Sequence, residues 1–129
     1  MSIPFNENLK ISEDLSWGML KYGLCSYFTL AYVNKYHSER FLAIMEYDDE
    51  LEKEYLVHFL VVNEQNIFID AEGTYSKWRD AVKDMTDIEF MDLRTKEVNK
   101  DFITKMIEED MGFDDEIYEP IKNFVNNTY

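Results

Sequence analysis

Cysteine, glycine and proline are all scarce in this chain. Its 129 residues include one cysteine, Cys25, so an intramolecular disulfide and a zinc site built from several cysteines are both excluded. Only four glycines and two prolines interrupt the sequence, which has no internal repeat and no Gly/Ser linker. Hydrophobic residues make up 46% and aromatic residues 16%, the composition of a folded globule. We therefore expect a single domain over residues 1–129, held together by packing, in a reducing cytoplasmic setting.

Basic residues are scarce as well. Thirteen lysines and arginines stand against 27 aspartates and glutamates, and the net charge is −14. This charge repels phosphate backbones and anionic lipids, so we expect neither a nucleic-acid nor a membrane partner. No basic segment followed by an apolar run opens the chain, and no apolar run approaches the roughly 18 residues that a membrane span needs. The acidity either keeps an aromatic-rich protein soluble or fits the basic surface of a protein partner.

The order of helical and β-rich segments predicts an α+β fold. An almost wholly apolar helical run over residues 24–36 opens near Cys25, as expected for a buried helix. Short β-rich runs between turn residues predict an antiparallel sheet. The expected strands are 41–47, 55–62, 67–71 and 88–93, and the further helices are 12–20, 76–85, 97–110 and 115–127. The sheet would pack against the N-terminal helix that carries Cys25, with additional helices at the C-terminus.

Polar residues at three expected helix starts suit the N-cap position, where a side-chain oxygen accepts a free backbone N–H. Ser12 precedes the first expected helix, Ser76 the inserted one, and Asp114 or Asp115 the last. Pro120 falls within the first turns of the last helix, where proline is best tolerated.

Residues 55–71 are expected to form a hairpin whose register places its buried polar residues. Opposed residues of an antiparallel pair share a face. A three-residue loop, 63–65, sets His58 opposite Asp70 and leaves the other face apolar, and a five-residue loop keeps the same faces. A four-residue loop would bury His58 and Asp70 on different faces without partners, which costs stability. The hydrophobic pattern therefore favours His58 beside Asp70.

Cys25, His58 and Asp70 have the chemistry of a nucleophile, a base and an orienting carboxylate. A carboxylate that accepts the Nδ1 proton of a histidine fixes its tautomer, so that the other ring nitrogen takes a proton from a thiol. A helix start and a protonated histidine both favour the thiolate, so they lower the thiol pKa. We therefore expect the three residues to act in these roles.

The same residues resemble a known group. The pattern G-x-C at the start of a buried helix, followed by V-H-F-L-V and then by I-F-I-D-A-E-G, resembles the papain-like and transglutaminase-like superfamily. Small bacterial and phage members carry a Cys on a helix, a His within a strand and an Asp before a glycine turn. The matching positions are Cys25, His58, and Asp70 with Gly73, within residues 22–80. The resemblance implies a papain-like fold and thiol-dependent hydrolysis or acyl transfer on an amide or peptide bond, with no cofactor.

Two parts of such a site are less defined by the sequence. The backbone N–H of Cys25 supplies one donor for an oxyanion, and Asn6 and Asn8 are the only upstream side-chain amides for a second. Tyr75 and Trp78 follow the third expected strand closely and are expected to bind the peptide or protein substrate.

Other interpretations stay open. Taken singly, Cys25, His58 and Asp70 are each typical of structural core or turn residues. Three such ligands and a water match a catalytic zinc pattern, although the close ligand spacing of zinc motifs is missing. The fold could also belong to a non-catalytic acidic binding protein, such as an inhibitor, an immunity protein or a phage anti-defence factor, that occupies a basic protein surface. An enzyme needs a cleft open at Cys25, whereas a binding protein is indifferent to Cys25→Ala.

Overall fold

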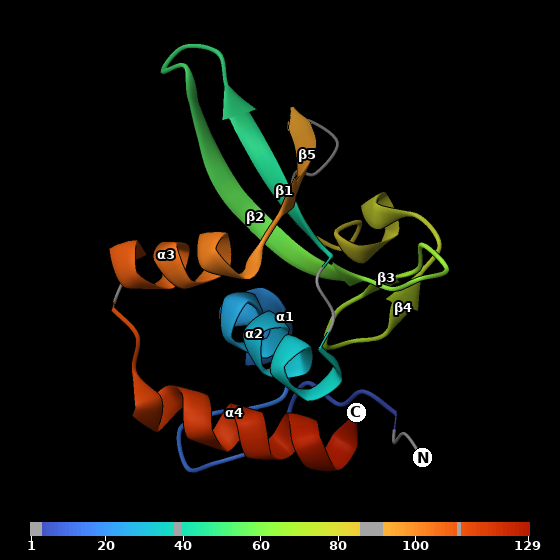
Figure 1. The fold of residues 1–129 in the computed structure, drawn as a ribbon, viewed down its shortest axis with the longest axis vertical. Helices are drawn as coiled ribbons and strands as arrows, with labels where there is room; N and C mark the ends of the chain where they lie inside the picture. The colour runs from blue at the N-terminus through green and yellow to red at the C-terminus, as the bar shows by residue number, and fades with distance from the viewer. Residues whose placement is uncertain (1–3, 38–39, 86–91, 111) are drawn as a thin grey trace.

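The computed structural model describes residues 4–37, 40–85, 92–110 and 112–129. Its elements, in chain order, are α1 (Met19–Tyr22), α2 (Cys25–Tyr36), β1 (Phe41–Asp48), β2 (Lys53–Val62), β3 (Phe68–Ile69), β4 (Thr74–Tyr75), the 3₁₀ helix η1 (Trp78–Ala81), β5 (Leu93–Val98), α3 (Lys100–Asp110) and α4 (Asp115–Thr128). Within the described residues, five strands form one antiparallel sheet in the order β4-β3-β2-β1-β5 (Figure 1). The expected α+β class with an antiparallel sheet is confirmed.

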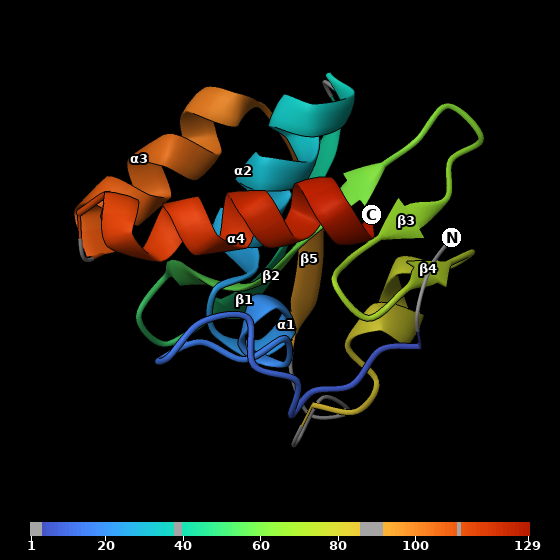
Figure 2. The same ribbon diagram turned by 90° about the horizontal axis from the view of Figure 1, so that it is seen from below.

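The helix α2 is buried at the centre of the molecule, as the apolar run predicted. Figures 1 and 2 show it between the sheet and α4, with α3 alongside. Its buried side chains are Cys25, Tyr27, Phe28, Thr29, Leu30, Ala31 and Val33. Full burial of one large apolar side chain contributes about 1.5–3 kcal/mol, so this packing holds the first turn of α2 firmly in place.

The helix α4 covers the other side of α2. Asp114 caps this helix, because its Oδ1 accepts the backbone N–H of Glu116 at 2.9 Å. Of the two aspartates that the sequence offered as the cap, Asp114 is therefore the correct one. Tyr118, Ile121 and Val125 form its buried stripe at helical spacing. Among the helices of the described residues, none combines the length and the apolar character that a membrane span requires.

A β-bulge on β2 places the side chains of Leu56 and His58 on opposite faces of the sheet. Ile44 of β1 pairs with His58 and the next residue, Met45, pairs with Leu56, so Val57 is the extra residue. A bulge bends the strand and re-aims its side chains. Leu56 consequently packs with Met45 in the larger core beside the helices, whereas His58 shares its face with Ile44, which belongs to a second, smaller core.

The β2–β3 hairpin has a five-residue loop, longer than the three-residue loop that the pattern favours. Val62 pairs with Phe68 across residues 63–67. The loop is closed by Asn63, whose Oδ1 accepts two backbone N–H groups of the loop at 2.9 and 3.0 Å. His58 therefore does not stand directly opposite Asp70, but the odd loop length keeps both on one face, as expected.

Two of the helices predicted from the sequence are not formed. Over residues 12–20 only the last two residues belong to a helix, α1, and Ser12 caps nothing, because an isolated bridge between Lys10 and Ser16 turns this segment back on itself. Over residues 76–85 the structure has the single 3₁₀ turn η1, which follows Lys77 and has no side-chain cap from Ser76.

The last expected strand and the helix after it also need correction. Residues 88–91 lie outside the described part of the chain, and the strand in this region is β5, from Leu93 to Val98. The helix α3 begins at Lys100 instead of residue 97, because Glu97 and Val98 pair with β1. Asn99 provides the cap, since its Oδ1 accepts the N–H of Phe102 at 2.9 Å.

Candidate active site

Cys25 is the first residue of α2. The chain leaves α1 through a tight turn, in which the N–H of Leu24 donates to Met19 O at 2.6 Å. The first bond of the new helix runs from the N–H of Phe28 to Leu24 O at 3.1 Å, so the N–H groups of residues 25–27 precede the intrahelical ladder. No acidic side chain lies in this first turn. The positive end of the helix dipole therefore favours a thiolate at Cys25.

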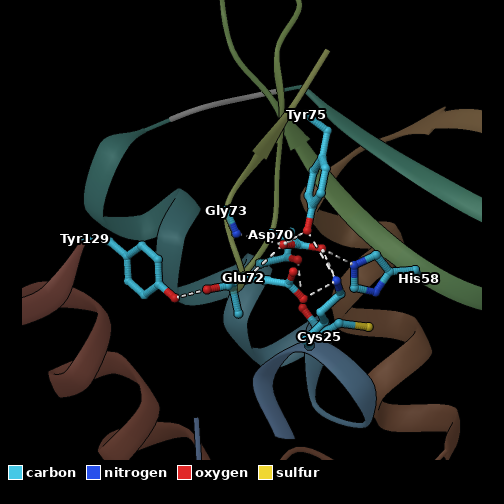
Figure 3. Close-up of polar contacts among 10 residues, drawn as sticks. Cys25, His58, Asp70, Glu72, Gly73, Tyr75 and Tyr129 are labelled. Carbon is cyan, nitrogen blue, oxygen red and sulfur yellow. Dashed lines mark hydrogen bonds and ion pairs between the residues drawn. The ribbon is translucent and has the colours of Figure 1, made fainter. Parts of the chain in front are cut away.

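His58 comes from the middle of β2 and is fully buried. Its Nε2 lies 3.0 Å from Asp70 Oδ2, whereas its Nδ1 has no hydrogen-bond partner among the described residues. In Figure 3 this remaining nitrogen faces the sulfur of Cys25. The expectation that Asp70 would bind Nδ1 is therefore wrong, because the ring is turned so that Nε2 meets the carboxylate. The two ring nitrogens can still take the expected roles, because Asp70 orients the ring through one of them and the other is available to exchange a proton with the thiol.

Asp70 stands directly after β3 and is 2% exposed. Its Oδ1 accepts the backbone N–H groups of Glu72 at 2.9 Å and Gly73 at 3.2 Å, and the Tyr75 hydroxyl at 3.1 Å. The N–H of Asp70 itself donates to Gly73 O at 3.0 Å. One oxygen thus caps the turn, which leaves the other for His58, so the turn-capping and orienting roles are combined in one residue.

Lys21 of α1 is a further member of the site that sequence reasoning missed. Its ammonium is 2% exposed and lies 2.6 Å from Glu72 Oε1, 3.2 Å from the Tyr75 hydroxyl and 3.9 Å from Asp70 Oδ2. Burial alone would lower the pKa of Lys21, but Glu72 and Asp70 together raise it, so the side chain stays charged. A single lysine in a one-turn helix carries no pattern that could have indicated this position.

Cys25 and His58 shift each other's ionisation. Burial alone would raise the pKa of the Cys25 thiol, but His58 and the backbone N–H of Phe59 outweigh it and lower the pKa. Burial would likewise lower the pKa of His58, but Asp70 and Cys25 raise it to about 9. The two groups therefore shift each other toward the charged pair, because the pKa of Cys25 is lowered and that of His58 is raised.

A pocket of about 380 Å³ opens at Cys25, within the range of about 300–1,000 Å³ typical of small-molecule sites. It is lined by the start of α2, by Leu56 of the bulged strand and by the end of α3. Ser26 and Tyr27 of the first turn of α2 also line the pocket, and backbone N–H groups at a helix start have no partner within the helix. Neither Asn6 nor Asn8 lines the pocket.

Tyr75 and Trp78 take different positions from each other. The Tyr75 hydroxyl binds Asp70, behind the histidine, and burial raises the pKa of Tyr75. Trp78 packs against the smaller core, with the Arg79 guanidinium 4.6 Å from its ring centre. Neither residue lines the pocket at Cys25. Within the described residues, no group of three or more His, Cys, Asp or Glu side chains is arranged to hold a metal ion.

Comparison with known proteins adds no relative to this picture. No protein-family model matches the chain, and neither a curated protein nor a solved structure is significantly similar to it.

Proposed function

We propose that this protein is a thiol-dependent hydrolase or acyltransferase, acting on an amide or peptide bond of a peptide or protein through Cys25, His58 and Asp70. The observation that carries the proposal is the one-sided bonding of His58, with Nε2 on Asp70 at 3.0 Å and Nδ1 unpartnered among the described residues. An unsatisfied buried polar atom costs about 1–3 kcal/mol, which is unfavourable for a purely structural histidine. The order Cys, His, Asp on these elements also supports membership of the papain-like and transglutaminase-like superfamily.

The first half-reaction forms an acyl-enzyme. The Cys25 thiolate attacks the carbonyl carbon of the amide, a C–S bond forms, and the carbonyl electrons move onto oxygen. The free N–H groups at the start of α2 stabilise this oxyanion. The His58 imidazolium then gives its Nδ1 proton to the leaving nitrogen, the C–N bond breaks, and an amine departs from the thioester.

The second half-reaction restores the site. Water, or an amine in the case of acyl transfer, attacks the thioester while neutral His58 takes its proton at Nδ1. The C–S bond breaks, the carboxylic acid or new amide leaves, and the thiolate and imidazolium are regenerated. Asp70 holds the ring in one orientation throughout and stabilises its charged form.

A direct test is to trap the acyl-enzyme. The protein is mixed with an activated ester such as p-nitrophenyl acetate and its intact mass is followed over time. The proposal predicts one acetyl group on Cys25 that is lost again by hydrolysis, and no adduct in Cys25→Ala. A library of fluorogenic amides then gives the substrate. Absence of any adduct on Cys25, or equal turnover by the variant, would contradict the proposal.

The second candidate function is a non-catalytic acidic binding protein that engages a basic protein surface. The observation that favours it is the projecting β1–β2 hairpin (Figure 1), whose tip exposes Asp49, Glu50 and Glu52 around Leu51, which is 58% exposed. Binding of this kind weakens steeply with salt and is unaffected by Cys25→Ala. The acyl-enzyme experiment therefore separates the two functions.

A further inference from the structure

The pocket at Cys25 is lined by helix ends of opposite polarity. The first turn of α2 is the positive end of that helix. The last turn of α3 contributes Glu109 and Asp110 to the lining and contains no basic residue. Carboxylates at a helix C-terminus lie at the negative end of the dipole, so the two effects add to a negative potential.

These carboxylates are available to a ligand. Among the residues that the structure describes, Glu109 forms an ion pair with Lys105 alone, at 3.9 Å, and both side chains are more than 60% exposed, so this pair is weak. No ion pair joins Asp110 to the other residues that the structure describes. The apolar part of the lining consists of Leu24, Leu56, Met106 and Ile107.

The end of α3 is held in a defined position relative to Cys25. Tyr27, two residues further along α2, donates its hydroxyl to Gly112 O at 3.4 Å and accepts the N–H of Asp114 at 3.1 Å. The N–H of Gly112 in turn donates to Ile107 O at 3.1 Å, and its φ of 78° permits this tight turn after the helix. The backbone that follows α3 is therefore bound to α2, and Glu109 and Asp110 line the same pocket as Cys25.

A second observation points to a ligand at this pocket. The Cys25 side chain lines it while being only 9% exposed, and the unpartnered Nδ1 of fully buried His58 faces that sulfur. A reactive group at the floor of a pocket needs a substrate long enough to reach it from the surface.

We propose that this pocket selects a substrate carrying a lysine or arginine side chain next to the scissile carbonyl, an inference that rests on the proposed function. The methylene stem of such a side chain packs on the apolar wall, and its cationic head binds Glu109 and Asp110. The scissile carbonyl then lies at the other end of the pocket, beside Cys25 and the N–H groups of α2. The substrate class is a basic peptide or protein segment.

The test uses thiol reagents that differ only in charge. The rate of Cys25 modification is measured by intact mass for cationic trimethylammonioethyl, neutral ethyl and anionic sulfonatoethyl methanethiosulfonate, each normalised to a free cysteine derivative. We expect the wild type to prefer the cationic over the anionic reagent by about tenfold or more at low salt. Glu109→Gln with Asp110→Asn should remove most of that preference.

A matched control separates the pocket from the overall charge of −14. Glu64→Gln with Asp80→Asn removes the same charge from two exposed positions, in the β2–β3 loop and in η1, away from α3 (Figure 1). This variant should keep the wild-type preference. Equal rates for the three reagents, or a preference that Glu109→Gln with Asp110→Asn leaves unchanged, would overturn the inference.

The outcomes also separate this inference from the proposed function. A charge preference that depends on Glu109 and Asp110, without an acyl-enzyme on any ester or amide, supports the cation-selective pocket and contradicts the hydrolase. Turnover that is equal for an arginine amide and its uncharged citrulline analogue contradicts the pocket and supports the hydrolase. A Cys25 that reacts with none of the reagents contradicts both.

Discussion

The two nitrogens of the His58 ring lie in opposite surroundings. On the Nε2 side, Asp70 is bound by two backbone N–H groups, a tyrosine hydroxyl and the ring itself, with a buried lysine 3.9 Å away. On the Nδ1 side, the described residues offer no hydrogen bond, and the sulfur of Cys25, a residue that lines a pocket, faces the ring.

This difference separates the part of the site that holds the ring from the part that reacts. Every polar group behind His58 is satisfied by another, so that side is a structural network. The Nδ1 side, which we call the front of the ring, leaves one nitrogen and one thiol for a substrate. Changes behind the ring should therefore reduce stability, whereas changes in front of it should remove reactivity at little cost in stability.

The largest expected effect comes from Asp70→Ala. This change leaves His58 and Lys21 buried without their common carboxylate and removes the cap of the turn before Gly73. Breaking a buried charged pair in this way costs about 3–5 kcal/mol of unfolding free energy. Urea denaturation measures it, and Asp70→Asn is the matched control, because an amide oxygen still caps the turn. A loss in Asp70→Ala below 1 kcal/mol would contradict the structural role of this network.

Lys21→Met should have the next largest effect. The substitution keeps the length of the side chain but removes the donor to Glu72 and Tyr75 and the positive charge beside Asp70. Hydrogen bonds to charged groups contribute about 1.5–3 kcal/mol, and we expect a loss in this range. The comparison is Lys10→Met, at an exposed lysine, which should leave the urea midpoint unchanged. Equal midpoints for the two variants would show that the buried lysine is dispensable.

The pH dependence of stability should differ between the wild type and Cys25→Ala. The pKa of His58 is raised to about 9 from its ordinary 6.5, so its contribution is complete below pH 6.5 and is lost as the pH rises through about 9. In the wild type the lowered pKa of folded Cys25 acts in the opposite direction, because the unfolded chain keeps the thiol proton to higher pH than the folded protein does. The two effects offset each other, so the stability of the wild type should change less with pH in this window.

Without the thiol that balance disappears. From about pH 6.5 up to the His58 pKa of Cys25→Ala, which lies below that of the wild type because Cys25 no longer raises it, the unfolding free energy of the variant should fall by up to about 1.4 kcal/mol per pH unit, because only the folded state binds the proton. Thermal unfolding across this range measures the slope. Parallel profiles for the two proteins would mean that Cys25 is protonated near neutral pH.

Tyr75→Phe should have the smallest effect. The lost hydroxyl is one of three donors to Asp70 Oδ1, and the two backbone N–H groups remain. A net loss of about 1 kcal/mol is expected. Because the orienting bond from Asp70 to His58 is kept, the reactivity of Cys25 should stay within about twofold of wild type. A large fall in reactivity would instead place Tyr75 in the reacting half of the site.

Part of this structure could be predicted from the sequence, because several neighbouring residues carry the same hydrophobic pattern. The almost wholly apolar run predicted the buried position of α2, and the hydrophobic pattern of the hairpin placed His58 and Asp70 on one face although the predicted loop length was wrong. The ring orientation could not be predicted, since either nitrogen suits a carboxylate. Lys21 lies outside any pattern, and its role arises only when α1 packs against the turn after β3.

The most direct test of a reactive front side is the pH dependence of Cys25 alkylation by iodoacetamide. It is measured in the wild type and in His58→Gln, with circular dichroism to check that both are folded. A His-activated thiolate predicts fast alkylation that persists well below pH 7 in the wild type and falls steeply in the variant. Alkylation that begins only when the protein unfolds would contradict the account and make Cys25 a core residue.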